Sequence, residues 1–128
     1  MTSDRRIMVI DDEIDILTIV RRFLEKWGFE VDTFNNPLNA YEVFKTNPKR
    51  YSLALVDVRM PEISGIALAV MLRRVRKDIK ILVMTAFEIS VKDIESDTPE
   101  LKPMNILQKP FVHKQVCDAV KKQLQIPS

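Results

Sequence analysis

Short apolar runs alternate with longer amphipathic stretches five times along the chain, and this alternation limits the folds that the chain can adopt. Short apolar runs are typical of buried strands, and apolar residues spaced three and four apart are typical of helices. The alternation therefore predicts an α/β fold with a doubly wound, five-stranded parallel sheet. The predicted strands are 7–10, 29–34, 53–57, 79–84 and 104–108, and the predicted helices are 14–27, 40–45, 66–75, 88–101 and 112–124.

The length and charge of the chain limit its organisation and its partners. A length of 128 residues fits one hydrophobic core, so we expect residues 1–128 to form a single domain. The net charge of +2 is too small to favour binding to nucleic acid or to a membrane surface. Residues 73–77 form a dense basic run, which we interpret as the solvated end of a helix, where cations suit the helix dipole.

Several further features predict a cytoplasmic protein. No apolar stretch approaches the ~20 residues that a membrane span needs, and residues 1–6 lack the apolar core of a signal peptide. The single cysteine, Cys117, cannot form an internal disulfide, and we expect it in or beside the core. We expect His113 at the surface and Trp27 in the packed face of the first helix.

Polar side chains follow four of the five predicted strands. They are Asp11 and Asp12 after the first strand, Asp57 at the end of the third, Thr85 after the fourth and Lys109 after the fifth. An unpaired buried charge costs on the order of 5 kcal/mol, so Asp57 needs partners. Sites in doubly wound sheets form outside the carboxyl ends of the strands, so we expect these five residues to converge there.

The converging groups suit phosphoryl chemistry. Carboxylates packed together repel one another, and Mg²⁺ removes the repulsion because it binds one or two carboxylates together with phosphate. Lys109 offers a cation and Thr85 a donor to an oxyanion attached to Asp57. A carboxylate that accepts a phosphoryl group needs a metal, a cation and donors aimed at the phosphoryl oxygens.

Each of these residues alone has a simpler structural interpretation. Residues 11–13 could cap the first helix, Asp57 could cap the turn that follows it, and residues 109–110 could form a turn before the last helix. Capping explains any one of these signals. It explains poorly four signals that each stand at the end of a separate strand.

From Ile7 to Leu124, the chain resembles the receiver domain of bacterial and archaeal two-component response regulators. The resemblance is carried by the segments VIDDE (9–13), LVDVRMPEISG (55–65), VMTA (83–86) and QKPF (108–111). It implies the flavodoxin-like (βα)5 form of the fold. It also implies a signalling module controlled by phosphorylation.

The resemblance implies a role for each carboxylate. Asp57 corresponds to the phosphoacceptor, which takes a phosphoryl group from the phosphohistidine of a sensor histidine kinase or a phosphotransfer protein. Asp12 corresponds to a direct Mg²⁺ ligand, and Asp11 to its partner, acting through water. The backbone carbonyl of Arg59 completes the expected metal site.

The resemblance also implies a set of groups that bind the phosphoryl oxygens. They are Thr85, Lys109 and the backbone amides near Val58 and Ala86. The family usually holds the Lys–Pro bond in cis, so the Lys109–Pro110 bond is expected to be cis.

The chain departs from the family pattern in the region of its fourth helix. The family commonly has Tyr or Phe three residues before the lysine, where this chain has Ile106. Residues 102–103 are Lys-Pro, where the family often has Gly-Ala, and Pro99 interrupts the predicted helix. We therefore expect intact phosphorylation chemistry with an atypical output surface.

Two side chains are expected to control the lifetime of the phosphorylated state. Arg59 and Phe87 lie two residues past Asp57 and Thr85, at positions that border the attacking water in receivers. Our hypothesis is that these bulky side chains restrict that water and slow dephosphorylation.

We therefore expect the chain to be a signalling module and not an enzyme. Its expected partner after phosphorylation is a downstream effector protein, and we expect it to bind neither nucleic acid nor a membrane. A phosphorylation-dependent homodimer is left open. A haloacid-dehalogenase phosphatase would need an acid at Arg59, and a flavodoxin-like cofactor binder would need a Ser/Thr/Gly-rich loop after the first strand. A receiver-like interaction module that is never phosphorylated stays as the alternative because of Ile106.

Overall fold

The computed structural model describes residues 5–126, and the two ends of the predicted 1–128 domain lie outside the described residues. Five strands form one sheet in the order β2-β1-β3-β4-β5, and every pair is parallel. The strands are β1 Arg6–Ile10, β2 Glu30–Phe34, β3 Leu53–Asp57, β4 Lys80–Thr85 and β5 Asn105–Gln108. The predicted doubly wound α/β fold is confirmed.

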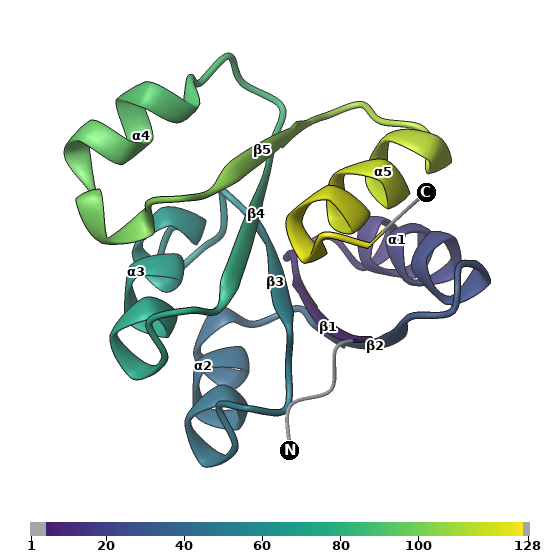
Figure 1. The fold of residues 1–128 in the computed structure, drawn as a ribbon, viewed down its shortest axis with the longest axis horizontal. Helices are drawn as coiled ribbons and strands as arrows, with labels where there is room; N and C mark the ends of the chain where they lie inside the picture. Colours follow the sequence, from purple (N-terminus) through teal and green to yellow (C-terminus); the bar gives the residue numbers. More distant parts are fainter. Residues whose placement is uncertain (1–4, 127–128) are drawn as a thin grey trace.

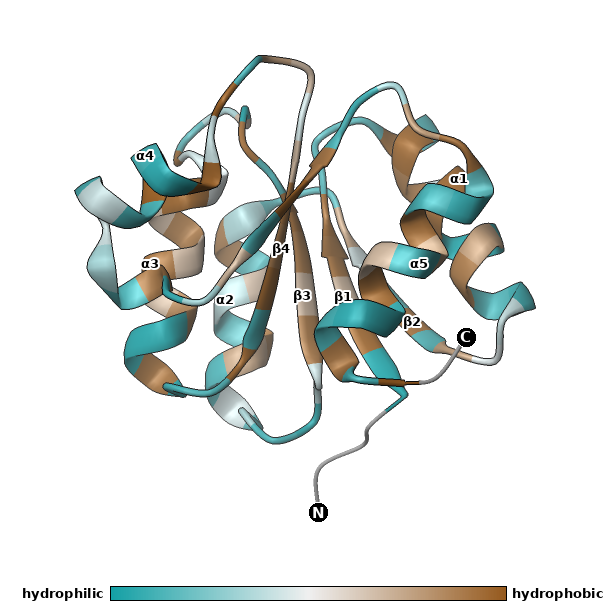
Figure 2. Ribbon diagram, turned by 45° about the horizontal axis from the view of Figure 1, so that its top comes forward, coloured by the Kyte–Doolittle hydropathy of each residue, from teal (hydrophilic) through white to brown (hydrophobic). Residues whose placement is uncertain are grey.

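Helices cover both faces of the sheet (Figures 1 and 2). Helices α1 and α5 lie on one face, and α2, α3 and α4 lie on the other. The bounds are α1 Ile14–Lys26, α2 Pro37–Thr46, α3 Gly65–Val75, α4 Val91–Asp97 and α5 His113–Leu124, with a 3₁₀ turn, η1, at Pro99–Leu101. Each face has its own apolar cluster, so the two layers of helices pack on the sheet independently.

The central strand β3 explains why its sequence is so continuously apolar. All five of its residues are buried, because helices cover both of its faces and strands flank both of its edges. The order of the strands reverses between β1 and β3, which makes the carboxyl ends of these two strands the switch point of the sheet.

Helix α1 follows its predicted stripe, with Leu17, Val20 and Leu24 buried. The prediction for Trp27 was wrong, because this side chain is 45 % exposed. Its ring lies on the surface between α1 and α5, where its indole N–H donates to His113 Nε2 at 2.6 Å and Lys121 Nζ lies 3.7 Å from the ring centroid. His113 is half-buried by this contact.

Helix α2 begins three residues earlier than predicted, at Pro37 in place of Ala40. The side chain of Asn36 caps the helix by accepting hydrogen bonds from the N–H groups of Leu38 and Asn39. Pro37 lacks an N–H that would need a partner in the first turn, so it suits the first helical position.

The fourth helix is short. It runs for 7 residues, Val91–Asp97, capped by the side chain of Ser90, and Pro99 then begins the η1 turn. The Lys102–Pro103 bond that follows is cis. The structure therefore divides the predicted helix 88–101 at the residue that the sequence marked as an interruption.

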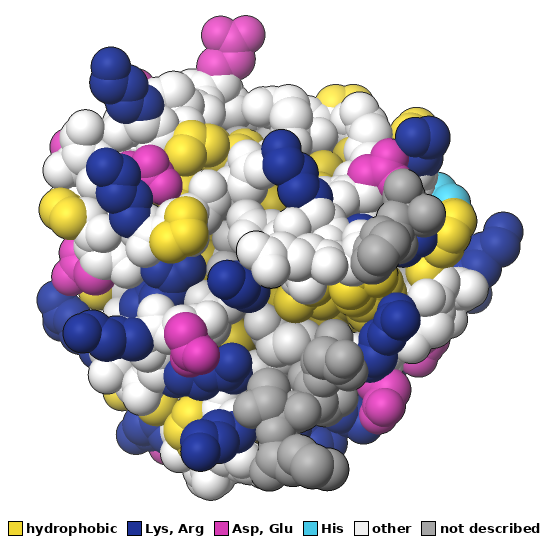
Figure 3. Space-filling model, in the orientation of Figure 1, with side chains coloured by type: hydrophobic (Ala, Val, Ile, Leu, Met, Phe, Trp, Pro, Cys, Tyr) yellow, Lys and Arg dark blue, Asp and Glu magenta, His cyan; other side chains and the backbone are white. Residues whose placement is uncertain are grey.

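The prediction that residues 73–77 form a solvated helix end was wrong for Arg73, which is only 6 % exposed. Its guanidinium donates to Ile79 O at 2.7 Å, and to the carbonyls of Glu100, Lys102 and Pro103 at 2.9 to 3.2 Å. Burial lowers the pKa of Arg73. Arg74 and Lys77 are exposed. Figure 3 shows many Lys and Arg side chains on the face that it draws.

Two further features concern the cysteine and the character of the helices. Cys117 is buried, as expected. None of the helices in the described part of the chain combines the length and the apolar character that a membrane crossing requires.

Candidate functional site

The predicted site residues lie at the carboxyl ends of four neighbouring strands. Asp57 and Thr85 are the last residues of β3 and β4. Asp11 and Asp12 directly follow β1, and Lys109 directly follows β5. Because parallel strands end at the same edge of the sheet, the fold brings these residues together at the switch point.

Three carboxylates form a compact cluster there. One oxygen from each of Asp11, Asp12 and Asp57 lies within 4.8 Å of the others. Asp11 is fully buried and Asp57 is 5 % exposed, whereas Asp12 is exposed to solvent. Oxygen ligands from carboxylates are those that Mg²⁺ prefers, so the cluster has suitable donors for a divalent cation.

Lys109 bridges two of the carboxylates. Its Nζ lies 3.0 Å from Asp11 Oδ2 and 3.1 Å from Asp57 Oδ1. The sequence predicted a cation facing Asp57, but it gave no sign of the second contact with Asp11. The other oxygen of Asp11 accepts a hydrogen bond of 2.9 Å from the N–H of Glu13, which fixes the carboxylate at the start of α1.

Burial is the main influence on the pKa values of the buried carboxylates in the cluster. Burial raises the pKa of Asp11 to about 6, although the Glu13 N–H and Lys109 partly oppose the rise. Burial also raises the pKa of Asp57, again against the effect of Lys109, and the charges of Asp12 and Glu13 add to the rise. Burial lowers the pKa of Lys109, but its hydrogen bonds to the two carboxylates outweigh this effect and leave it raised. The charge of Asp57 also raises the pKa of Asp11, and a bound cation would relieve this smaller contribution from repulsion.

Thr85 is almost fully buried, with 1 % of its surface exposed. Its hydroxyl oxygen accepts a hydrogen bond of 3.0 Å from the N–H of Phe87. Its carbonyl accepts from the N–H of Lys109 at 2.7 Å, so the backbone ties the ends of β4 and β5 to each other.

The loop after β3 is held closely against the sheet. The N–H of Val58 donates to Met84 O at 2.9 Å, so this amide is already engaged within the sheet. The N–H of Gly65 donates to Val58 O at 2.8 Å. A Cβ atom at Gly65 would lie 1.9 Å from the carbonyl oxygen of Asp57, so only glycine fits there.

A cavity of about 340 Å³ opens above Asp57, and both Arg59 and Phe87 line it. The Arg59 guanidinium lies 4.4 Å from the centroid of the Phe87 ring, which is a cation–π contact. Arg59 follows β3 and Phe87 follows β4, so the contact joins two loops beside the carboxylates. The sequence identified both residues, but not their contact.

Two further features lie at the end of the sheet near β5. The Lys109–Pro110 bond is cis, as expected. Ile106 is half-buried and packs against the apolar cluster on the α2, α3 and α4 side of the sheet, together with Ile89 and Val91.

Comparison with known proteins agrees with this geometry. Residues 7–121 match the family model of the response regulator receiver domain. The response regulator receiver protein CpdR of Brucella abortus is 33 % identical over 120 residues, which cover 94 % of this chain and 97 % of that protein. Sporulation initiation phosphotransferase F of Bacillus subtilis is 26 % identical, and the match covers 98 % of both chains.

Solved structures show the same likeness. The response regulator protein TrrA of Thermotoga maritima, in complex with Mg²⁺-BeF, superposes with a TM-score of 0.78 at 31 % identity, covering 93 % of this chain and 98 % of that one. A CheY-like receiver domain protein of Methanospirillum hungatei gives a TM-score of 0.82 at 24 % identity, covering 96 % and 95 %, and supports the fold.

Proposed function

The chain belongs to the response regulator receiver domain family and is a module of phosphorylation-controlled signalling, and we propose that Asp57 is its phosphoacceptor. A carboxylate oxygen of Asp57 attacks the phosphorus of a phosphohistidine on a sensor histidine kinase or a phosphotransfer protein. The N–P bond breaks, its electron pair stays on the imidazole nitrogen, and that nitrogen takes up a proton. Water then attacks the phosphorus of the aspartyl phosphate, the bond between phosphorus and the Asp57 oxygen breaks, and inorganic phosphate leaves the restored carboxylate.

One observation carries this proposal most strongly. Asp57 is the carboxylate that ends the buried central strand, and it meets Lys109 Nζ at 3.1 Å beside a cavity large enough for a phosphoryl group. The phosphoryl group would add negative charge at this point. Lys109 and Thr85 line the same cavity as Asp57, which supports the proposal that they receive this charge.

The donor set fits Mg²⁺. Asp11, Asp12 and Asp57 would hold the ion, with the carbonyl of Arg59 as a further proposed ligand. When bound, the ion neutralises charge on the carboxylates and on the phosphoryl oxygens. Asp12 is exposed and can reach an ion from the solvent side. Asp11 is held in place by hydrogen bonds from the N–H of Glu13 and from Lys109 Nζ.

Lys109 and Thr85 have complementary tasks in the proposed transfer. Lys109 orients Asp57 in the unmodified protein and would pair with a phosphoryl oxygen after transfer. The Thr85 hydroxyl would donate to a second oxygen. The Val58 amide is bonded to Met84 O, so the amides of Arg59 and Ala86 are the better candidates for backbone donors.

We also propose partners, a location and an assembly for this domain. The partners would be a histidine kinase or phosphotransfer protein and a downstream effector, with catalysis restricted to the domain's own phosphorylation and dephosphorylation. We propose that residues 1–128 form one receiver domain, that the domain is cytoplasmic, and that phosphorylation could lead to a homodimer. Ile106 supports an altered output step, because it cannot provide the aromatic side chain that the family commonly has there.

A direct test uses a small phosphodonor with Mg²⁺, followed by intact mass measurement. We expect a gain of one phosphoryl group in the natural sequence and none in Asp57→Asn. A matched control, Asp118→Asn, removes an exposed carboxylate from α5 and should leave the gain unchanged. Absence of any gain would favour the interaction module that is never phosphorylated, and a gain that survives Asp57→Asn would contradict the assignment of Asp57.

A further inference from the structure

Strand β2 forms one open edge of the sheet. In a parallel pair, a strand directs the N–H and C=O of alternate residues to the same neighbour. The N–H of Glu30 and the C=O of Phe34 bond to the β1 side, so the intervening Val31 and Thr33 direct their N–H and C=O groups outward. This edge therefore presents backbone groups that another strand could pair with.

Two hollows flank this edge, one of about 430 Å³ towards α2 and one of about 490 Å³ towards α1. Both are lined by Arg21 and Thr33, so they form one continuous depression that follows β2. We call it the β2-edge groove. It is defined here by Arg21, Thr33, Phe34, Val43, Asn47 and Arg50.

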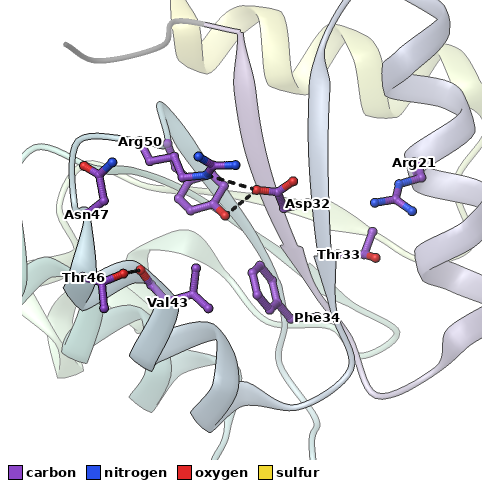
Figure 4. Close-up of a pocket in the computed structure, with 9 residues that line it drawn as sticks. Arg21, Asp32, Thr33, Phe34, Val43, Thr46, Asn47 and Arg50 are labelled. Atoms are coloured by element: carbon purple, nitrogen blue, oxygen red, sulfur yellow. Dashed lines mark hydrogen bonds and ion pairs between the residues drawn. The ribbon is translucent and has the colours of Figure 1, made fainter.

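Figure 4 shows that the groove has two different sides. Arg21 extends from α1 towards β2 on one side, and Val43, Asn47 and Arg50 lie on the other. Successive side chains of an extended strand point to opposite faces, so a strand laid along this edge would present alternate residues to the two sides.

The α1 side is lined by two arginines, Arg21 and Arg22, and by one acid, Glu25, so its balance of charge favours an anion. The Arg21 guanidinium donates one hydrogen bond of 3.1 Å, to the outward-facing carbonyl of Val31. Its Nε is buried, and among the described residues it is the one buried side-chain nitrogen or oxygen without a hydrogen-bond partner. A buried donor without a partner is costly, and a carboxylate is the acceptor that a guanidinium binds best.

The α2 side suits an apolar group. Its acid, Asp32, is already bound by Arg6 at 2.8 Å, by the Tyr51 hydroxyl at 2.5 Å and by Arg50 at 3.4 Å. Phe34 and the 38 % exposed Val43 supply apolar surface beside these paired charges.

We propose that the β2-edge groove binds an extended acidic segment of a partner protein as a sixth strand of the sheet. Acidic side chains of the segment face Arg21, and the alternating apolar side chains face Phe34 and Val43. The backbone of the segment pairs with Thr33 and with the N–H of Val31. A small anion fits less well, because Arg50 is committed to Asp32 and the outward backbone groups would stay unused.

The test uses the peptide acetyl-(Glu-Val)₃-amide with the ¹⁵N-labelled protein. We expect saturable binding, with shifts and slowed hydrogen exchange of the Val31 and Thr33 amides. Acetyl-(Lys-Val)₃-amide should bind far more weakly because its charges oppose Arg21. The acidic peptide with an N-methyl group on every residue should also lose binding, because none of its backbone amides can then donate to the edge of β2.

Variants of the protein distinguish binding at the β2-edge groove from a general attraction between the acidic peptide and basic side chains. Arg21→Gln should weaken binding by about tenfold, whereas Lys26→Gln removes a charge from the exposed end of the same helix and should leave it unchanged. Thr33→Pro removes an outward N–H without touching the bonds to β1, and should abolish binding.

The proposal is overturned if the acidic peptide does not bind. It is equally overturned if the N-methylated peptide binds as well as the parent, or if inorganic phosphate displaces the peptide and produces the same shifts. If Thr33→Pro fails to fold, the comparison of Arg21→Gln with Lys26→Gln still tests the proposal.

Discussion

We propose that the contact between Arg59 and Phe87 acts as a gate at the side of the cavity above Asp57. Water that hydrolyses an aspartyl phosphate has to approach through this cavity, and the two side chains line it from different loops. A cation–π contact at an exposed site is worth about 1 kcal/mol, so removing it should speed dephosphorylation by about fivefold. We expect this increase for both Arg59→Asn and Phe87→Ala, measured as loss of the phosphorylated mass with time.

The gate makes a further, non-additive prediction. The double variant should be little faster than either single variant, since each change alone already breaks the contact. Phe87→Leu keeps an apolar side chain but loses the ring, so it should resemble Phe87→Ala. Unchanged rates in the single variants would refute the gate.

Single residues of the site could be recognised from sequence because their types are unusual at strand ends. A carboxylate closing a buried strand, as Asp57 does, has no packing role, and Lys109 is the natural counter-charge for it. The bridge from Lys109 to Asp11 and the Arg59–Phe87 contact depend on side-chain conformation across different strands. No pattern along the chain encodes such distances, so only the structure could reveal them.

Arg73 ties helix α3 to the remodelled segment between α4 and β5. Its guanidinium serves four backbone carbonyls, three of which belong to residues 100–103. In Arg73→Met these buried carbonyls would lose their donors, and we expect a loss of about 3–5 kcal/mol in the free energy of unfolding. Arg74→Met, at the exposed neighbouring position, should change stability by less than about 0.5 kcal/mol.

Urea denaturation measures both variants, and hydrogen exchange tests where the effect lies. Amides of α4 and η1 should lose protection in Arg73→Met more than those of β1 or α1, because the tie holds only the former segment. Equal stability losses in Arg73→Met and Arg74→Met would contradict this role.

Elements with strong periodicity or continuous burial were predictable, and those fixed by distant contacts were not. Strand β3 was predicted to the residue, and the stripe of α1 was correct apart from its last side chain, Trp27. The basic run 73–77 looked solvated because its local pattern matches a helix end. The carbonyls that bury Arg73 lie 27 to 30 residues further along the chain for three of its four bonds.

The charge cluster at the switch point makes the stability of the domain depend on pH, and we expect a dependence on Mg²⁺ as well. Asp11 is fully buried, and its pKa rises from 3.8 to about 6 on folding, which corresponds to about 3 kcal/mol of lost stability at high pH. Asp57 shifts in the same direction. Between pH 4 and about 6 the folded state therefore binds more protons than the unfolded state, and stability rises as the pH falls through this range.

The free energy of unfolding of the metal-free domain should consequently increase by about 1–2 kcal/mol when the pH falls from 7.5 to 5. Mg²⁺ should stabilise the domain at pH 7.5, because the ion binds the ionised carboxylates of the folded state. The stabilisation should be smaller at pH 5, where protons compete with the ion. Urea denaturation in a chelator and in millimolar Mg²⁺ measures both effects. Asp11→Asn removes the buried titrating group, so it should flatten the pH dependence and weaken the response to Mg²⁺. Two results would show that this cluster does not control the stability of the fold. One is a steady loss of stability from pH 7.5 to pH 5 in the metal-free natural sequence. The other is an Asp11→Asn variant whose stability depends on pH as that of the natural sequence does.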